Sequence, residues 1–370
     1  MPRKRKSPFR LTALDIFAGG GGLSVGLKRA GFHVVGAVEI ESNAFATYKA
    51  NHPEVTAFKQ DVCTVRGDAL RVLSPSGQID LLAGCPPCQG FSSLTSKYKK
   101  PHPGNRLVKE MTRLVEEISP RAVMMENVPG LQDKGKHLLK EFLDALESNG
   151  YIVNQDILQV ADYGVPQSRR RLVVLAGKGF AIELPKATHS RTSSDGRKPW
   201  KTIRKVIYGM PRPITLHEAI KRGGPQSFGW HVVRDLSAAN MRRLKQAKPG
   251  RSWTSIAKRL RPKCHQDRTT GFSNVYGRMR WTEVSPSITG GCTTFSKGRF
   301  GHPQANRTIS VREAAILQTF PLDYVFDTPY MEYACKIVGN ALPCDFAEVL
   351  ARACTDALCE HNRSSSRKQG

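Results

Sequence analysis

The stretch that decides the fold is DIFAGGGG, Asp15–Gly22, which follows an apolar run beginning at Leu11 and precedes an amphipathic segment ending at Gly31. Glycines between a strand and a helix let the backbone approach a ligand closely, and the helix N-terminus favours negative charge. Gly31 lies where the C-cap of that helix belongs. Ser24 and Val25 stand where the dinucleotide fingerprint places its third glycine, so a nicotinamide cofactor is a weaker interpretation than another nucleotide-like one.

Strand-like apolar runs recur through the first half of the chain. They cover Leu11–Phe17, Val34–Ile40, Val55–Val62, Ile79–Ala83, Ala122–Val128, Ile152–Val160 and Leu172–Ala176. Helical patterns lie between them, notably Arg106–Ile118 and Lys136–Ser148. This alternation predicts an α/β fold, with a mostly parallel sheet and helices on both faces. Ligands bind such sheets at the carboxyl ends of the strands.

The composition changes after Gly177. Residues from Lys178 to about Gly271 are rich in Pro, Gly, Ser, Arg and Lys, and all four tryptophans lie between Trp200 and Trp281. The clearest helical pattern in this region is basic, over Leu236–Lys248. We interpret the region as a smaller, irregular domain with the tryptophans in its core.

Regular patterns return near the end of the chain. Ser310 and Glu313 have the spacing of a capping box for a helix over Val311–Gln318. Phe346–Leu358 predicts a final amphipathic helix. The tail from His361 is polar, and we expect it to be disordered.

The charge of the chain is strongly basic and uneven. The net charge is +26, from 57 Lys and Arg against 31 Asp and Glu. Gly177–Arg280 holds 24 of the basic and 5 of the acidic residues, so this segment alone carries +19. A basic excess concentrated in one segment indicates nucleic-acid binding. A merely soluble cationic surface is the alternative, although a solvated face usually mixes both signs.

The apolar runs and the cysteines argue against a membrane or secreted protein. No run approaches the ~20 residues that span a bilayer. The basic start, Met1–Lys6, is followed by too short an apolar stretch for a signal peptide. Nine cysteines without a repeated spacing argue against a disulfide framework. We therefore expect a cytoplasmic protein with reduced thiols and no membrane partner.

Carboxylates end two neighbouring strand-like runs. Glu39 ends the second run, at a place suited to ribose hydroxyls, and Asp61 ends the third, where it could bind an adenine amino group. The alternative for each is a solvated carboxylate at a strand end. Their placement at successive strand ends favours one shared site.

The motif Cys85-Pro86-Pro87-Cys88 follows the fourth run and admits three interpretations. It could be a redox pair. It could be half of a zinc site, but the sequence has no second Cys-x-x-Cys, and structural zinc takes four ligands. It could instead present one activated thiolate from a rigid proline turn.

Further polar residues point to the same edge of the sheet. Glu126 ends the fifth run, so it lies on the edge that carries Cys88. A cysteine nucleophile beside a carboxyl group suits attack on an electron-poor ring whose nitrogen must be protonated. With a period of two, Gln167, Arg169 and Arg171 share one face at the entry to the seventh run. A surface patch of arginines is the alternative.

Together these motifs resemble the cytosine-5 DNA methyltransferases of the bacterial restriction-modification type, in family order over nearly the whole chain. The matching segments are Asp15–Gly22 (first cofactor motif), Val38–Ile40 and Gln60–Val62 (ribose and adenine contacts), Pro86–Gln89 (catalytic proline-cysteine motif), Glu126–Val128, Gln167–Arg171, Arg307–Pro321 and Gly339–Pro343. The four consecutive glycines depart from the family pattern, which leaves the position of Gly20 variable, and we expect cofactor binding to tolerate this.

The resemblance implies a domain organisation and a cofactor. A Rossmann-like methyltransferase domain would cover 10–177 and 330–362, and a target-recognition domain 178–329, including the motif at 307–321; 1–9 and 363–370 would be disordered tails. S-adenosylmethionine is the implied methyl donor, without a metal. The implied cofactor contacts are Asp15, Phe17, Ala18, Gly19, Gly20, Gly22, Leu23, Glu39, Ile40, Asp61, Val62, Pro86, Asn340 and Ala341.

The resemblance also implies a reaction. Cys88 would attack carbon 6 of a cytosine flipped out of the duplex, while protonated Glu126 stabilises the ring nitrogen. Arg169 and Arg171 would hold the base carbonyl, the phosphate or Glu126 itself, with Gln167 in the same catalytic set. Carbon 5 would take the methyl group, and loss of its proton would expel Cys88.

Double-stranded DNA of a specific sequence is the implied partner. We expect a monomer at the bacterial nucleoid, acting with a cognate restriction endonuclease or as an orphan methylase. A tRNA cytosine methyltransferase shares the motifs, but the long basic insert favours DNA. A rival of another class is a thiol-disulfide oxidoreductase that uses Cys85 and Cys88.

Overall fold

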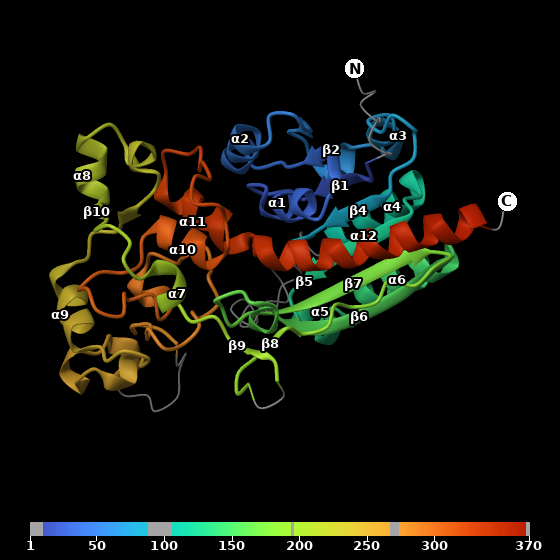
Figure 1. Cartoon of the computed structure of the whole chain (residues 1–370). Coiled ribbons are helices and arrows are strands. Elements are labelled where there is room, and N and C mark those ends of the chain that lie inside the picture. The colour runs from blue at the N-terminus through green and yellow to red at the C-terminus, as the bar shows by residue number, and fades with distance from the viewer. Residues whose placement is uncertain (1–9, 88–105, 194–195, 267–273, 368–370) are drawn as a thin grey trace, which may run out of the picture. The chain divides into compact units, whose positions relative to one another are not determined.

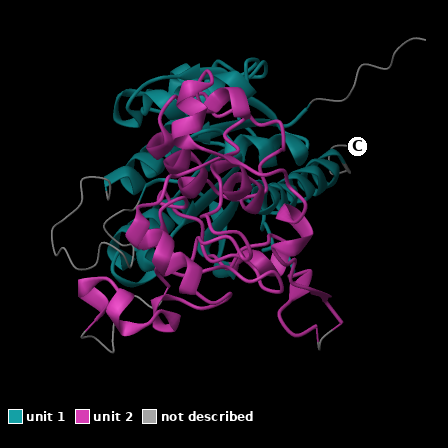
Figure 2. Ribbon diagram, turned by 90° about the vertical axis from the view of Figure 1, so that its left-hand side faces the viewer, with its two compact units in different colours: residues 1–158, 170–186, 344–370 teal, residues 159–169, 187–343 magenta. Residues whose placement is uncertain are grey.

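The computed structural model describes residues 10–87, 106–193, 196–266 and 274–367, and it divides into two compact units. Unit 1 comprises Met1–Leu158, Arg170–Lys186 and Cys344–Gly370, and unit 2 comprises Gln159–Arg169 and Ala187–Pro343 (Figure 2). The long segment of unit 2 thus lies in sequence between two segments of unit 1. The units differ from the expected domains, because Gln159–Arg169 belongs to unit 2 and the boundaries expected after 177 and 329 lie after Lys186 and Pro343. The assignment of a role to each unit stays a prediction.

Unit 1 is built on a seven-stranded sheet with the order β3-β2-β1-β4-β5-β7-β6 (Figure 1). The strands are β1 (Thr12–Ile16), β2 (His33–Val38), β3 (Thr56–Phe58), β4 (Leu81–Gly84), β5 (Ala122–Asn127), β6 (Tyr151–Gln159) and β7 (Arg170–Lys178). Neighbours from β3 to β5 pair in parallel, and β5 pairs with β7 antiparallel. The seven apolar runs are these seven strands, so the expected mostly parallel α/β sheet is confirmed.

Helices cover both faces of this sheet. They are α1 (Gly22–Arg29), α2 (Ser42–Asn51), α3 (Gly67–Arg71), α4 (Leu107–Ile118), α5 (Gly130–Asp133), α6 (Lys136–Ser148) and α12 (Cys344–Arg367). Alternate strand residues such as Leu14, Val123 and Met125 form one core with the apolar stripes of α4 and α6. The inner strands β1, β2, β4, β5 and β7 are buried on both sides, which is why they read as continuous apolar runs, whereas the edge strands β3 and β6 are half-buried or exposed along most of their length.

Helices α1 and α12 pack closely against one another. Their contact depends on Gly26, because a Cβ atom built there would overlap Ala347 and the backbone of Glu348. Arg29 reinforces the pairing with an ion pair to Asp345 at 2.9 Å. The last helix of the chain is thereby fixed against the first (Figure 1).

The expectation of a disordered tail from His361 is wrong as far as Arg367, because α12 continues to that residue. The expected disorder of 1–9 and 368–370 lies outside the described residues. Two contacts hold the helix beyond Leu358: His361 stacks on Phe180 with ring centroids 4.6 Å apart, and Asn362 accepts a hydrogen bond from Arg121. Extending an existing helix also costs far less than starting one. No helix in the described part of the chain is long and apolar enough to cross a membrane.

Unit 2 has short elements joined by long irregular segments. Its α-helices are α7 (Arg204–Ile207), α8 (Leu216–Lys221), α9 (Ala238–Gln246), α10 (Val311–Leu317) and α11 (Met331–Asn340), and its strands β8 to β11 have two residues each. The expected capping box is present, since the Ser310 side chain accepts from the Glu313 N–H and the Glu313 carboxylate accepts from the Ser310 N–H. Trp230 and Trp253 are buried core residues, whereas Trp200 and Trp281 are half-buried.

Candidate active site

The glycine loop begins directly after β1 and ends at α1. Phe17, Gly19 and Gly21 have φ values of 63°, 54° and 90°, in the left-handed region that glycine adopts without strain. The Ala18 N–H donates to the Val38 carbonyl over 3.0 Å, which ties the loop to β2. A Cβ atom at Gly19 would meet no atom within 4 Å, so open space lies beside the loop there.

A buried carboxyl group lies under this loop. Asp15 is 0% exposed, and one oxygen accepts a 2.6 Å hydrogen bond from Ser24. Its other oxygen has no partner among the described residues. Burial raises the pKa of Asp15 to about 7. Ser24 departs from the dinucleotide fingerprint, and the structure shows that its hydroxyl joins Asp15 to Tyr48, 2.8 Å away.

A second polar network, formed by Lys28 and His52, contacts the backbone of the glycine loop. His52 Nδ1 lies 2.6 Å from Lys28 Nζ, and His52 Nε2 lies 3.2 Å from the Gly21 carbonyl oxygen. Because the ammonium only donates and the carbonyl only accepts, the ring carries its proton on Nε2. Burial lowers the pKa of His52 to about 4, which keeps the ring neutral. No pattern in the sequence pointed to His52, since its partners come from another helix and a loop.

The two predicted nucleoside carboxylates have different surroundings. Glu39 follows β2 and accepts from the Gly19 N–H at 2.8 Å and the Glu41 N–H at 2.7 Å. Burial raises its pKa. Asp61 follows β3 and caps the short helix at Val62–Thr64; the hydrogen bond from the Cys63 N–H lowers its pKa.

These features fit a nucleoside-like cofactor. The unpartnered oxygen of Asp15 and the open space beside Gly19 lie at the carboxyl end of β1. Glu39 lies at the end of β2 and Asp61 after β3, so they follow successive neighbouring strands. Ile40 is 61% exposed at the same edge, which leaves an apolar surface open beside Glu39.

The end of β4 carries the proline-cysteine motif. Pro86 is buried, and its carbonyl oxygen accepts a 3.0 Å hydrogen bond from Asn127 Nδ2 at the end of β5. Asn127 Oδ1 accepts in turn from the Val128 N–H at 2.8 Å. The Glu-Asn-Val segment therefore fixes the backbone that leads into the motif. Cys88 itself lies outside the described residues.

Cys85 is unsuited to act as a thiolate. Burial and the neighbouring Glu126 carboxylate raise the pKa of its thiol well above the usual range. A reactive redox cysteine needs the opposite, a lowered pKa. The oxidoreductase interpretation therefore loses support.

Glu126 and Arg171 form an ion pair at this edge of the sheet. Arg171 Nε lies 2.5 Å from Glu126 Oε1, and the two side chains are 14% and 9% exposed, respectively. Sheet geometry brings them together: Glu126 is opposite Val173 in the antiparallel β5–β7 register, so Arg171, two residues before Val173, lies on the same face. Contact with Glu126 was one of the three roles foreseen for Arg171, and the structure shows this contact.

Gln167 and Arg169 have their contacts within unit 2. The Gln167 amide bonds to Gln318 at 2.6 Å and accepts from the Ile288 N–H at 2.8 Å. Arg169 Nη1 donates to the carbonyl oxygens of Ile288 and Gly339. Burial alternates from Gln167 to Arg171 as a period of two predicts, although β7 begins only at Arg170. The catalytic role of Gln167 and Arg169 stays a prediction.

The predicted contacts from the last motif also lie in unit 2. Asn340 ends α11, and the Ala341 carbonyl accepts a 3.0 Å hydrogen bond from Gln318 Nε2. Gly339 allows a close approach to Thr289 and Gly290, where a Cβ atom would overlap the backbone. A role for Asn340 and Ala341 in cofactor binding stays a prediction.

Comparisons with known proteins agree with this arrangement. The profile of the C-5 cytosine-specific DNA methylase family matches residues 11–356. The Type II methylase M.HgiDII of Herpetosiphon aurantiacus is 34% identical over 92% of this chain and 94% of its own length. The Type II methyltransferase M1.HphI of Haemophilus parahaemolyticus is 33% identical over 93% and 86%, respectively.

Solved structures share the fold. A prophage-encoded protein of E. coli, described as a DNA modification methyltransferase, superposes with a TM-score of 0.69 at 23% identity, covering 94% of this chain and 99% of that one. The S. pombe Dnmt2 methyltransferase superposes with a TM-score of 0.60 at 18% identity, covering 95% and 100%. The family profile spans nearly all of the chain, and the chain therefore belongs to the C-5 cytosine-specific DNA methylases and is a DNA (cytosine-5-)-methyltransferase.

Proposed function

We propose that the enzyme methylates carbon 5 of a cytosine flipped out of a specific duplex sequence, through a covalent bond to Cys88. The observation that carries this proposal is the Glu126–Arg171 pair, which lies beside Cys85 and the Asn127-held Pro86 backbone at the ends of β4 and β5. A cysteine, an acid and an oriented cation on one edge suit addition to a pyrimidine ring.

Each residue has a role in the proposed reaction. The Cys88 sulfur forms a bond to carbon 6, and the electron pair displaced onto the ring is stabilised at the ring nitrogen by a proton from Glu126. The ion pair with Arg171 holds the Glu126 carboxyl group in one orientation. After methylation, carbon 5 loses its proton to a water molecule, the ring nitrogen returns its proton to Glu126, and the electron pair of the broken carbon–hydrogen bond expels the Cys88 sulfur from carbon 6.

The cofactor is proposed to bind at the carboxyl ends of β1 to β3. Bound S-adenosylmethionine supplies the methyl group that carbon 5 accepts. Phe17 and the glycine loop would lie against it, with Glu39 toward the ribose and Asp61 toward the adenine. Support comes from the open space at Gly19 and the unpartnered oxygen of Asp15.

Unit 2 is proposed to contain the target-recognition domain. The basic segment Gly177–Arg280 lies almost wholly within it and carries +19. Positive charge of this density supports phosphate binding. Because M.HgiDII and M1.HphI are Type II enzymes, we further propose host DNA modification alongside a restriction endonuclease, by a monomer in the cytoplasm. The tRNA alternative has no specific support in these relatives.

The test is mechanism-based trapping. Purified protein is incubated with labelled S-adenosylmethionine and mixed-sequence duplex DNA that contains 5-fluorocytosine, whose fluorine blocks the last elimination. We expect a labelled complex that survives denaturation with wild type and Cys85→Ser but is absent with Cys88→Ala. Sequencing the trapped DNA gives the target site. Transfer to tRNA without any complex on duplex DNA would contradict the proposal.

A further inference from the structure

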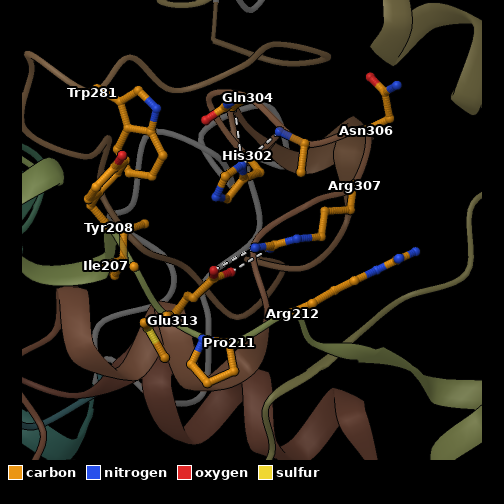
Figure 3. Close-up of a pocket in the computed structure, with 13 residues that line it drawn as sticks. Ile207, Tyr208, Pro211, Arg212, Trp281, His302, Gln304, Asn306, Arg307 and Glu313 are labelled. Carbon is orange, nitrogen blue, oxygen red and sulfur yellow. Dashed lines mark hydrogen bonds and ion pairs between the residues drawn. The ribbon is translucent and has the colours of Figure 1, made fainter.

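Unit 2 contains a pocket that the methyl-transfer residues do not explain. Its volume is about 430 Å³, which lies within the usual size of small-ligand sites. The lining comes from three separated parts of the chain: residues 207–212, Trp281, and the segment from His302 to Arg307 together with Glu313 on α10 (Figure 3). All of these belong to unit 2.

One wall of the pocket is aromatic. Tyr208 is 57% exposed, and its ring meets Trp281 edge-on, with centroids 5.4 Å apart at 83°. Trp281 meets His302 in the same way, at 5.2 Å and 87°. The guanidinium of Arg204 lies 4.5 Å from the centre of the Tyr208 ring. Perpendicular rings form a corner in which one face of a flat ligand can stack.

His302 provides a fixed hydrogen-bond donor. Its Nδ1 accepts from the backbone N–H groups of Gln304 and Ala305, at 3.2 and 2.9 Å, so the proton of the neutral ring is on Nε2. Burial lowers the pKa of His302 to about 4, so the ring stays neutral near pH 7. In Figure 3 the second ring nitrogen faces the side of Tyr208 and Glu313. A flat ligand there would receive a hydrogen bond from an uncharged donor.

The floor is neutral and the rim is positive. Arg307 binds the fully buried Glu313 carboxylate through two hydrogen bonds of 2.7 and 2.8 Å, so these two charges offset one another. Arg212 is exposed at the rim and extends away from Glu313 (Figure 3). A ligand with a flat, uncharged ring and a nearby anionic group matches this distribution. Among the components of DNA, a nucleotide has that composition.

We propose that this pocket binds a second nucleobase of the DNA substrate, unstacked from the duplex, with its ring against Tyr208 and Trp281. His302 Nε2–H donates to an acceptor atom of the base, and Arg212 contacts the adjoining phosphate. The base is distinct from the target cytosine, whose reaction partners Cys88 and Glu126 belong to unit 1. The proposal rests on the proposed action on duplex DNA and extends it to a second extruded position.

The experiment measures binding of the full chain to duplexes with the sequence found by trapping. A series carries a single mismatch at each successive position, because an unpaired base costs less to extrude. We expect wild type to bind at least one non-target mismatch more tightly than the paired duplex. Stacking on an aromatic ring is worth about 1–3 kcal/mol, so Tyr208→Ala removes between about fivefold and 150-fold of that affinity.

Two matched variants separate stacking from other effects. Tyr208→Phe keeps the ring and is expected to keep the mismatch preference. Tyr330→Ala removes a tyrosine of the same unit that is 59% exposed, against 57% for Tyr208, and is expected to bind like wild type. An unchanged mismatch profile in a folded Tyr208→Ala protein overturns the pocket proposal.

Further arms identify the source of the base and separate the two proposals. Free deoxynucleoside monophosphates are titrated while tryptophan fluorescence is recorded in wild type and Trp281→Phe. If a free nucleotide binds saturably and does not change the affinities for the mismatched duplexes, the proposal that the pocket binds a base of DNA is also overturned. Trapping of wild-type protein on fully paired duplex tests the methylation mechanism alone. If trapping occurs but Tyr208→Ala leaves the mismatch profile unchanged, the pocket proposal is rejected and the methylation proposal stands.

Discussion

Units 1 and 2 are stabilised by different means. In unit 1, seven strands exchange backbone hydrogen bonds, and apolar side chains fill both faces of the sheet. In unit 2 the strands have two residues each, and buried polar side chains form many of the hydrogen bonds that hold the backbone. Arg278 is 5% exposed and donates to the carbonyl oxygens of Leu244, His302 and Ala305. A unit with little periodic structure therefore depends on the identity of single side chains.

This difference changes how the basic charge is interpreted. Not every arginine in Gly177–Arg280 is available to DNA, because Arg278 is satisfied inside the unit. Arg243 donates to the Leu260 carbonyl, and Arg261 donates to that of Ile256. Fewer than the 24 basic side chains of this segment are thus free to contact phosphates directly.

If the residues that react with the base belong to unit 1, a substitution of its buried Glu126 should have the largest effect on the rate of methyl transfer. Glu126→Gln keeps the size of the side chain but supplies no acid proton. We expect kcat to fall by about 10²–10⁴, the usual contribution of general acid catalysis. Rapid-quench measurement of methyl transfer checks this. Glu116→Gln, at an exposed position on α4, serves as the control, and a Glu126→Gln enzyme as fast as that control would refute the role.

If unit 2 depends on single buried charges, Arg307→Met should damage it severely. The change leaves the Glu313 carboxylate buried without its cation, and removing one partner of a buried pair costs about 3–5 kcal/mol of unfolding free energy. Arg280→Met breaks an exposed pair with Glu283 and should cost less than about 1 kcal/mol. Denaturant unfolding followed by tryptophan fluorescence compares the two, and equal losses would contradict the prediction.

The same pair gives unit 2 an acid sensitivity. Burial alone would raise the pKa of Glu313, but Arg307 outweighs it and lowers the pKa below its usual value. A group with a lowered folded pKa contributes stability above its unfolded pKa and loses it as the pH falls through the folded value. Wild-type stability should therefore decline on acidification below the ordinary pKa of glutamate.

Unit 1 should respond to pH in the opposite sense. Because burial raises the pKa of Asp15 to about 7, folding favours its protonated form. The associated stability is fully present below the unfolded pKa and is lost as the pH rises through about 7, by a few kcal/mol. Asp15→Asn should abolish this slope, whereas Asp144→Asn, exposed on α6, should retain it. Unfolding titrations from about pH 4 to pH 8 decide the matter, and identical slopes in all three proteins would count against it.

The smallest effect concerns the brace of the glycine loop. His52→Phe removes the Nε2–H that donates to Gly21, and one hydrogen bond is worth about 0.5–1.5 kcal/mol. We expect KM for S-adenosylmethionine to rise about twofold to tenfold, with kcat unchanged. His52→Gln offers an N–H in its place and should restore most of the affinity. A rise in KM that Gln does not rescue would indicate a packing effect instead.

The sequence predicted unit 1 far better than unit 2. The seven strands appear in the sequence as apolar runs, and α6 begins and ends where its apolar stripe predicts, at Lys136 and Ser148. In unit 2, the capping box of α10 was visible because it is a local pattern over Ser310–Glu313. Tyr208, Trp281 and His302 are far apart in sequence, so no local pattern could place them around one pocket.

Within the site, local motifs predicted residues better than their partners. The family resemblance offered Glu126 as one of three partners for Arg171, and the antiparallel register of β5 and β7, which a mostly parallel pattern does not specify, brings these two residues together. Contact of Glu39 with a ribose stays a prediction, whereas its hydrogen bond from the Gly19 N–H was not expected. Tyr48 and His52 went unnoticed, because a polar residue on a helix gives no signal until its neighbours are known.

The fit of Gly26 against Ala347 has a consequence for synthesis on the ribosome. Helix α1 is made among the first residues, yet its packing partner emerges only after all of unit 2. The nascent chain must therefore carry an open face on α1 while unit 2 is translated, and unit 1 reaches its final packing last. A chain stopped after Pro343 retains all seven strands without α12, and limited proteolysis should cut it within α1 where the full chain resists.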